Sequence, residues 1–270
     1  MFTRRQFVGA AAAISSATAG LSLVGPAVGQ SNSAGEQTFV LLHGAMHGGW
    51  CWTRVRELLE AKGHNVFTPT LTGLGERSHL LTRDVSVETH IQDIVNVLRY
   101  EGLSDVTFVA HSYAGLVAAV IPDRVPGAIK KMVFLDAILP RSGESWSSLY
   151  TDEGRAGMMN RIETAGEGWK IPAAATKFFG VTNPADQDWA DPLITDHPGR
   201  TFTDVLTFDD QALMALDRTF IRCTDPALPT IESSKQRVRE GEGWNYHELP
   251  TGHDAMITMP EALTELIIQA

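Results

Sequence analysis

Ser112 lies in a sequence context that is typical of a nucleophilic serine. An apolar, β-rich run at 106–110 precedes it and a helical pattern from Gly115 follows, so it falls where a strand turns into a helix. Ala110 and Ala114 stand two residues before and after it. Such a tight turn leaves room there only for glycine or alanine, of which glycine is the commoner choice. The pattern predicts a serine that attacks a carbonyl carbon, and a helix-capping serine is the simpler alternative.

His253 is the candidate base for this serine. A serine hydroxyl is a weak nucleophile until a neighbouring imidazole takes its proton. His253 lies in the loop between the last predicted strand, 244–249, and the last predicted helix, 260–268. His247 is the nearest competitor, but it falls inside the strand pattern. The chain order serine, acid, histidine also requires a histidine after the last strand, so we expect His253 to be the base.

Two aspartates could orient that imidazole. Asp225 follows the predicted strand that ends at Cys223, and Asp136 follows the strand that ends at Leu135. Both therefore lie at the carboxyl ends of strands, where sites form in open parallel sheets. We favour Asp225 because it follows the strand that usually carries the acid in this chain order, and Asp136 remains the alternative.

Two backbone N–H groups are the candidate donors for a developing oxyanion. Acyl transfer needs such donors aimed at the oxygen that becomes negatively charged. One is the N–H of Tyr113, the residue directly after the serine. The other is expected from the loop after the first strand, His43-Gly44-Ala45, where we assign it to Ala45.

Strand and helix patterns alternate along most of the chain. Strands are predicted at 38–42, 65–67, 106–110, 131–135, 218–223 and 244–249, and helices at 50–61, 87–100, 115–121 and 260–268. This order is typical of an α/β fold in which helices cover both faces of a parallel sheet. Such a sheet brings the loops that carry Ser112, His253 and the two aspartates to one edge.

The alternation breaks down between about 140 and 211. This segment is rich in Gly, Pro, Asp and Met, and aromatic residues are scattered through it, among them Trp146, Trp169, Phe178, Phe179 and Trp189. A long irregular segment inside a compact domain is usually functional, and aromatic side chains suit the wall of a small-molecule pocket. We expect an inserted lid over the site, and the alternative is a decoration that serves stability alone.

The N-terminal residues have the features of an export signal. Arg4 and Arg5 give a positive start, and the uncharged, Ala- and Gly-rich run 7–28 follows. Small residues at 27–29 suit a signal peptidase. The twin arginines followed by Phe7 resemble a Tat-type signal, whose cargo folds before export. The alternative is an uncleaved anchor, but serines, a threonine and glycines make the run weakly apolar for a stable span.

This signal sets the predicted domain limits. We expect residues 1–29 to be removed, residues 30–37 to form a disordered linker and residues 38–270 to form one α/β domain with the insertion. The protein would then be periplasmic or secreted and would keep no stable membrane span after processing.

Composition restricts the partners of the chain. Its 270 residues carry 22 basic and 32 acidic side chains, and the net charge of −10 argues against a nucleic-acid surface. The only two cysteines, Cys51 and Cys223, are too few for a disulfide framework or a thiolate metal site. A single bridge between them is the alternative, and we expect two unpaired buried thiols. No histidine pair has carboxylate or cysteine partners at ligand spacing, so no metal or cofactor is expected.

From Phe39 to the C-terminus the chain resembles the α/β-hydrolase superfamily. The segments that carry the resemblance are FVLLHGAMHGGWCW, LTGLGERSH, AHSYAG, VFLDAILP and TGHDAM. They are similar to the branch that holds plant methylesterases, hydroxynitrile lyases and small bacterial esterases. The resemblance implies a sheet of about six mostly parallel strands. Similar lyases have Thr and Lys where this chain has Gly44 and Asp254, which favours hydrolysis over cyanohydrin cleavage.

The sequence therefore predicts a serine hydrolase that cleaves small, hydrophobic carboxylic esters through an acyl-enzyme. Its catalytic residues would be Ser112, His253 and Asp225, with Asp136 as the alternative acid. A lactone, an amide or a carbon–carbon bond could be cleaved by the same residues. A fold that binds a small molecule without turnover is the alternative from another class.

Overall fold

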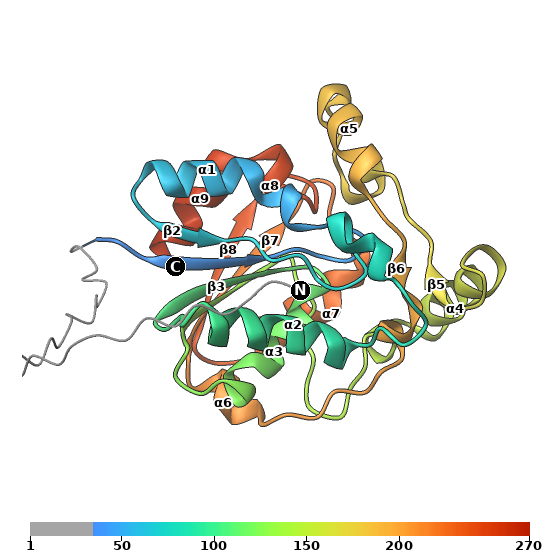
Figure 1. The fold of residues 1–270 in the computed structure, drawn as a ribbon, viewed down its shortest axis with the longest axis horizontal. Helices are drawn as coiled ribbons and strands as arrows, with labels where there is room; N and C mark the ends of the chain where they lie inside the picture. Colours follow the sequence, from blue (N-terminus) through green and yellow to red (C-terminus); the bar gives the residue numbers. More distant parts are fainter. Residues whose placement is uncertain (1–34) are drawn as a thin grey trace, which may run out of the picture. The chain divides into compact units, whose positions relative to one another are not determined.

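The computed structural model describes residues 35–270, and a six-stranded sheet lies at the centre of this part (Figure 1). Its strand order is β2-β1-β3-β4-β7-β8, and every neighbouring pair is parallel. The strands are β1 (Thr38–Leu42), β2 (Asn65–Phe67), β3 (Val106–His111), β4 (Ile129–Leu135), β7 (Asp217–Cys223) and β8 (Trp244–Leu249). The predicted α/β class and six-stranded parallel sheet are confirmed.

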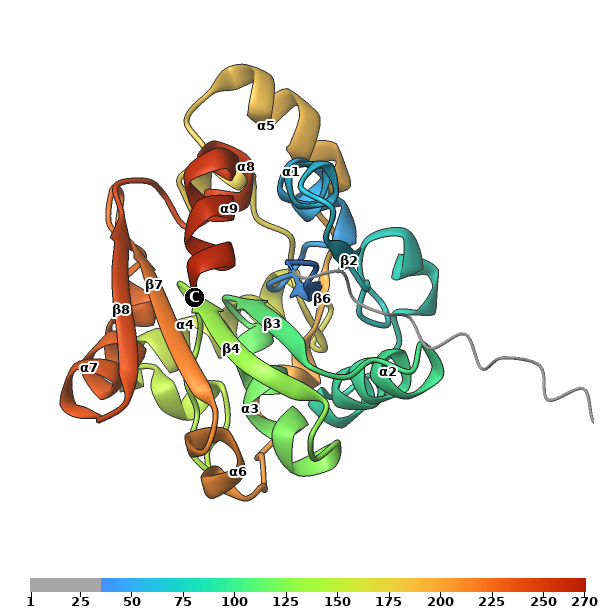
Figure 2. The ribbon, with the colours of Figure 1, turned by 90° about the vertical axis from the view of Figure 1, so that its left-hand side faces the viewer.

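Helices cover both faces of this sheet (Figure 2). On one face lie α1 (Thr53–Ala61), α8 (Ala255–Thr258) and α9 (Pro260–Gln269). On the other face lie α2 (Val87–Tyr100), α3 (Ala114–Arg124), α6 (Asp210–Met214) and α7 (Glu232–Glu240). The apolar side chains of the strands alternate between these two layers, since Val40 and Leu42 pack into one and Phe39 and Leu41 into the other. Burial on both faces explains why the strands read as continuous apolar runs.

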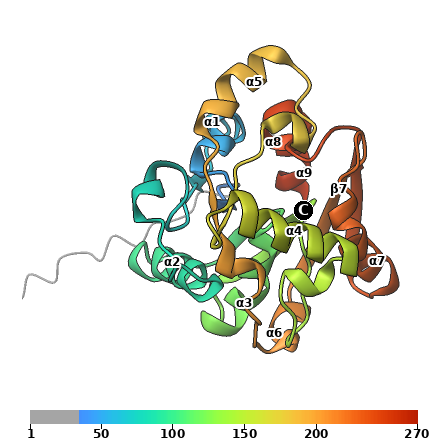
Figure 3. The same cartoon turned by 90° about the vertical axis from the view of Figure 1, so that its right-hand side faces the viewer.

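The insertion is more regular than its sequence indicates. It contains α4 (Asp152–Ala165), α5 (Pro184–Ala190) and a short antiparallel pair of β5 (Lys170–Ile171) and β6 (His197–Pro198). Helix α4 lies across the end of the sheet at which β1 and the other parallel strands have their carboxyl ends (Figures 1 and 3). Only Ile162 of α4 is buried, so this helix has no apolar stripe by which its sequence could be recognised.

The N-terminal predictions lie mostly outside the described residues. The export signal at 1–29 and most of the linker at 30–37 therefore stay predictions. The end of that linker is hydrogen-bonded, because Glu36 accepts from Asn65 and the Gln37 N–H donates to His64. Within 35–270, no helix combines the length and the hydrophobicity that a membrane span requires. Cys51 and Cys223 are both buried free thiols, as expected.

Candidate active site

Ser112 sits in a strained turn between β3 and α3. Its φ angle of 54° lies in the left-handed region, which costs a non-glycine residue about 1–3 kcal/mol unless the surroundings hold it there. Here the Ser112 N–H donates to the Leu135 carbonyl at 3.2 Å. The Ser112 carbonyl accepts from the N–H groups of Gly115 and Ile138 at 3.1 and 3.0 Å. This is the strand-to-helix turn that the sequence predicts, and it is fastened to β4 and to the loop after it.

Gly115 allows the loop after β4 to lie directly against the first turn of α3. A Cβ atom on Gly115 would stand 1.8 Å from the Ile138 carbonyl oxygen, so no other residue fits. This close approach brings the residues that follow β4 next to Ser112. Asp136 is among them.

His253 is buried with one ring nitrogen bonded and the other unpartnered. Its Nδ1 lies 2.6 Å from Oδ2 of Asp136, and a carboxylate oxygen accepts, so Nδ1 carries the hydrogen. Nε2 has no hydrogen-bond partner among the described residues. A neutral imidazole in this tautomer has a lone pair on Nε2 that is ready to accept a proton.

The acid that contacts His253 is Asp136, and the preference for Asp225 is wrong on geometry. Asp136 is fully buried, and its Oδ1 is paired with the Arg222 guanidinium and accepts from the Cys223 N–H at 3.2 Å. Asp225 is exposed, and its backbone N–H donates to the Thr251 carbonyl. The reason lies in the strand order, because β4 is the direct neighbour of β3 and its end therefore faces Ser112.

The two expected oxyanion donors flank Ser112. Ala45 lines the same cavity as Ser112, and Tyr113 follows the serine in the turn. Within 35–270, neither backbone N–H donates a hydrogen bond. The Tyr113 side chain is directed elsewhere, since its hydroxyl donates to Nδ1 of His90 at 2.8 Å while His90 Nε2 donates to the Thr72 carbonyl.

His43 fixes the loop that carries Ala45. Its Nδ1 donates to the Gly44 carbonyl at 2.8 Å, and its Nε2 accepts from the Leu71 N–H at 3.1 Å. Burial lowers the pKa of His43 to about 3, so the ring is neutral and keeps these two roles. These bonds fix the backbone after β1, and the role of this segment as an oxyanion loop stays a prediction.

Gly44 leaves no space for a side chain beside the nucleophile. A Cβ atom there would lie 2.8 Å from Cβ of Ser112 and 2.9 Å from Nδ1 of His111. We expect Gly44→Ala to lower kcat by about 10- to 100-fold, because a displacement of 1 Å at a reacting group has an effect of this size. Steady-state kinetics on a p-nitrophenyl ester measure the change. The matched control is Gly157→Ala, where the added Cβ meets open space. Equal kcat in both variants would contradict the argument.

A mainly apolar cavity of about 130 Å³ opens over Ser112. The insertion contributes Trp146, Met158 and Phe178 to its lining, and the segment after β7 contributes Leu228 and Ile231. A neighbouring cavity of about 320 Å³ is lined by His253 and shares Phe178, Phe179, Leu228 and Thr230 with the first. The serine and the histidine therefore each face a cavity, and the two cavities share one wall.

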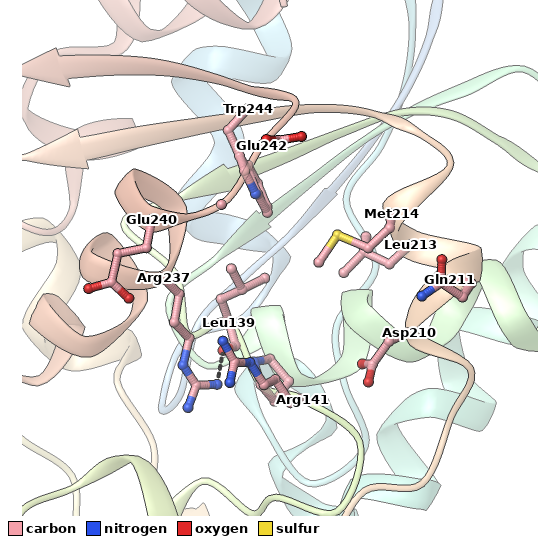
Figure 4. Close-up of a pocket in the computed structure, with 12 residues that line it drawn as sticks. Leu139, Arg141, Asp210, Gln211, Leu213, Met214, Arg237, Glu240, Glu242 and Trp244 are labelled. Carbon is pink, nitrogen blue, oxygen red and sulfur yellow. Dashed lines mark hydrogen bonds between the residues drawn. The ribbon is translucent and has the colours of Figure 1, made fainter.

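A further cavity of about 250 Å³ lies away from these residues, between α6, α7 and the loop after β4 (Figure 4). Its rim carries Arg141, Arg237, Glu240 and Glu242. Arg237 is already bound, because it donates to the Leu139 carbonyl at 2.9 Å and pairs with Glu144. None of the candidate catalytic side chains lines this cavity.

Arg222 is a site residue that the sequence reasoning did not single out. It is buried in β7, and it contacts Asp136 and donates to the Leu228 carbonyl at 3.2 Å. A buried arginine requires an anionic partner. An arginine between Ile221 and Cys223 in an apolar strand was therefore a usable signal that a carboxylate lies nearby.

Among residues 35–270, no cluster of three or more His, Cys, Asp or Glu side chains could hold a metal ion.

Comparison with known proteins gives consistent matches. A model of the alpha/beta hydrolase family matches residues 39–266. The carbendazim hydrolyzing esterase of Nocardioides sp. (strain SG-4G) is 33% identical over 238 residues, which cover 84% of this chain and 96% of that protein. Methylesterase 2 of Arabidopsis thaliana is 27% identical over 262 residues, covering 86% and 95%. An extracellular alpha/beta-hydrolase from a Paenibacillus species superposes with a TM-score of 0.75 at 22% identity, covering 87% and 98%.

Proposed function

Because the chain belongs to the alpha/beta hydrolase family and its esterase relatives make it a carboxylic ester hydrolase, we propose that it cleaves small hydrophobic esters through an acyl-enzyme on Ser112. The resemblance to methylesterases and bacterial esterases that the motifs indicate is thereby confirmed. One observation carries the proposal. His253 is held on Asp136 through Nδ1 while its Nε2 is buried without a partner among the described residues, and Ser112 stands in a strained turn at the cavity that adjoins the one lined by His253.

The reaction begins with a proton transfer. His253 Nε2 removes the Ser112 hydroxyl proton while Oγ attacks the ester carbonyl carbon, and Asp136 stabilises the imidazolium that forms. The carbonyl oxygen becomes an oxyanion and accepts hydrogen bonds from the N–H groups of Ala45 and Tyr113. Neither donor has to give up another hydrogen bond first, because within residues 35–270 neither N–H is engaged.

Collapse of the tetrahedral intermediate releases the alcohol. His253 gives its proton to the leaving oxygen, and the acyl group stays on Ser112. Water then enters, loses a proton to His253 and attacks the acyl-enzyme, which restores the serine and frees the acid. Every step uses side chains and backbone groups of this chain.

The shape of the site favours hydrophobic esters. Most residues that line the cavity at Ser112 are apolar, and the insertion supplies several of them, which is the role expected of a lid. Within residues 35–270, Arg161 is the one charged residue in this lining, and it donates to the carbonyls of Pro172 and Ala173. The cavity at Ser112 and the cavity at His253 would hold the two parts of the ester on either side of the scissile bond.

Labelling with a fluorophosphonate tests whether Ser112 is activated. These reagents react rapidly only with a serine whose proton is taken by a base. We expect mass spectrometry to find one label, on the peptide that contains Ser112. If the protein remains unlabelled by the fluorophosphonate but still binds esters, the non-catalytic alternative is favoured. A panel of matched esters, lactones and amides then identifies the bond, and we expect turnover to be fastest with the esters.

We also propose that the protein is exported through its N-terminal twin-arginine segment. The support is the sequence alone: Arg4-Arg5, the uncharged run at 7–28 and the small residues at 27–29.

A further inference from the structure

His47 is a buried histidine whose two ring nitrogens both face oxygen atoms. Its Nδ1 lies 2.8 Å from the Ala45 carbonyl oxygen, and its Nε2 lies 3.2 Å from Oδ2 of Asp254. His47 and Asp254 are both essentially inaccessible to solvent. A carbonyl oxygen and an ionised carboxylate can only accept hydrogen bonds. Both nitrogens of His47 therefore need a hydrogen, which makes the ring an imidazolium paired with the Asp254 carboxylate.

Among the residues that the structure describes, Asp254 is the one charged partner of His47. His43 is neutral, since burial lowers its pKa to about 3. The His111 ring, 6.2 Å away between centroids, is neutral too, because burial and then the neighbouring His253 and His47 lower its pKa well below the usual range. His111 Nε2 donates to the His253 carbonyl at 3.1 Å.

The remaining neighbours of this pair are uncharged. Trp50 stacks on the His47 ring and Phe179 of the insertion meets its edge. Burial raises the pKa of the Cys51 thiol, which keeps that group neutral. Burial alone would lower the pKa of His47, but the charge and hydrogen bond of Asp254 and the Ala45 carbonyl outweigh it and raise that pKa above 6.5.

The His47–Asp254 pair connects the two loops on which the reaction depends. Ala45 supplies an oxyanion donor, and Asp254 directly follows His253 in the chain. The N–H of Asp254 also donates to the Phe179 carbonyl at 3.3 Å, which ties the insertion to the same point. A shift of either loop would therefore change the distance between the base and the oxyanion donor.

We propose that His47 is a positioning residue that acts as an imidazolium, fastening the Ala45 loop to the His253 loop through Asp254. The inference rests on the proposed function for its kinetic consequences, but the protonation state of His47 is independent of it. A neutral His47 has a single N–H and must release either the Ala45 carbonyl or Asp254. The oxyanion donor then loses its alignment with His253.

This arrangement predicts a specific pH dependence. The protonated form of His47 is the one that holds the two loops together, and its pKa is raised. The contribution of the His47–Asp254 pair to kcat is therefore complete below that pKa. It is lost as the pH rises through the raised pKa. Because oxyanion contacts form in the transition state, the loss should appear in kcat, with little change in KM.

Nitrogen NMR of ¹⁵N-histidine-labelled protein at pH 7 tests the charge of His47 without turnover. We expect one histidine to show two protonated ring nitrogens, and that signal to be absent from His47→Gln. In Asp254→Asn the same ring should become neutral. A single bare nitrogen on His47 in the wild-type protein would overturn the inference, even if Ser112 is fully active.

Kinetics on a p-nitrophenyl ester test the positioning role. We expect His47→Gln to lower kcat by about 10- to 100-fold with KM within about twofold, and to abolish the alkaline decline in kcat. His79→Gln replaces an exposed histidine and is the matched control. Wild-type kcat in a folded His47→Gln variant would contradict the proposal. If Ser112 were not the nucleophile, fluorophosphonate labelling would fail while the NMR result stood, so the two failures are distinguishable.

Discussion

Replacement of Ser112 by alanine is expected to lower kcat/KM for short p-nitrophenyl esters by at least about 10³-fold. Alanine keeps the tight turn and leaves Ala45 and Tyr113 in place, so substrate binding and oxyanion stabilisation remain. What disappears is the oxygen that forms the acyl-enzyme, and with it the covalent route. The residual rate should be that of an oriented but uncatalysed water attack.

Two measurements make this result specific. Circular dichroism and thermal unfolding establish that Ser112→Ala is folded, and KM or inhibitor binding establishes that the cavity is intact. Burst-phase kinetics in the wild-type protein should release about one equivalent of alcohol before steady turnover, and the variant should give no burst. Turnover by Ser112→Ala near the wild-type rate would exclude an acyl-enzyme on this serine.

The second large effect is expected from Asp136→Asn, which should lower kcat by roughly 10³- to 10⁴-fold. Asparagine preserves the shape of the side chain, but its amide presents a donor or a neutral acceptor to His253 Nδ1. Such a group no longer fixes the tautomer of His253 or stabilises its imidazolium. The wild-type contact is the 2.6 Å hydrogen bond between His253 Nδ1 and Asp136 Oδ2. Rates of acylation by a fluorophosphonate should fall in parallel.

Asp225→Asn is the matched control, because the same chemical change is made at an exposed position. Its kcat should stay within about twofold of wild type, as for most surface substitutions. A large loss in Asp225→Asn with a small loss in Asp136→Asn would reverse the assignment. Asp136→Asn also leaves Arg222 without its buried anion, so thermal unfolding should show destabilisation of that variant alone.

The fold and most of the site could be predicted from the sequence because their signals are local. The run 38–42, buried on both faces, reads as a strand without knowledge of its neighbours. Ser112 is marked by the small residues two positions on either side, and His253 by its place after the last strand. Each of these patterns reflects a steric or chain-order requirement within a few residues.

The acid could not be assigned from the same kind of signal. Asp136 and Asp225 both follow a strand and both lie between Ser112 and His253 in the chain, so chain order does not separate them. The difference is which strand neighbours β3, and that is a property of the sheet order. Helix α4 has a weak local signal, because it buries one residue and its start at Asp152 is marked only by the cap Thr151 and two acidic side chains.

The ion pair between Arg222 and Asp136 has a consequence for charge balance during turnover. In the resting protein the Arg222–Asp136 pair is neutral as a unit, and His253 is bonded to it through Nδ1. In the tetrahedral intermediate of the proposed mechanism, a positive imidazolium and a negative oxyanion arise together, and their charges sum to zero. On that mechanism, the charges of these four groups stay balanced throughout acylation. An uncompensated ion would be costly in a buried interior of low polarity.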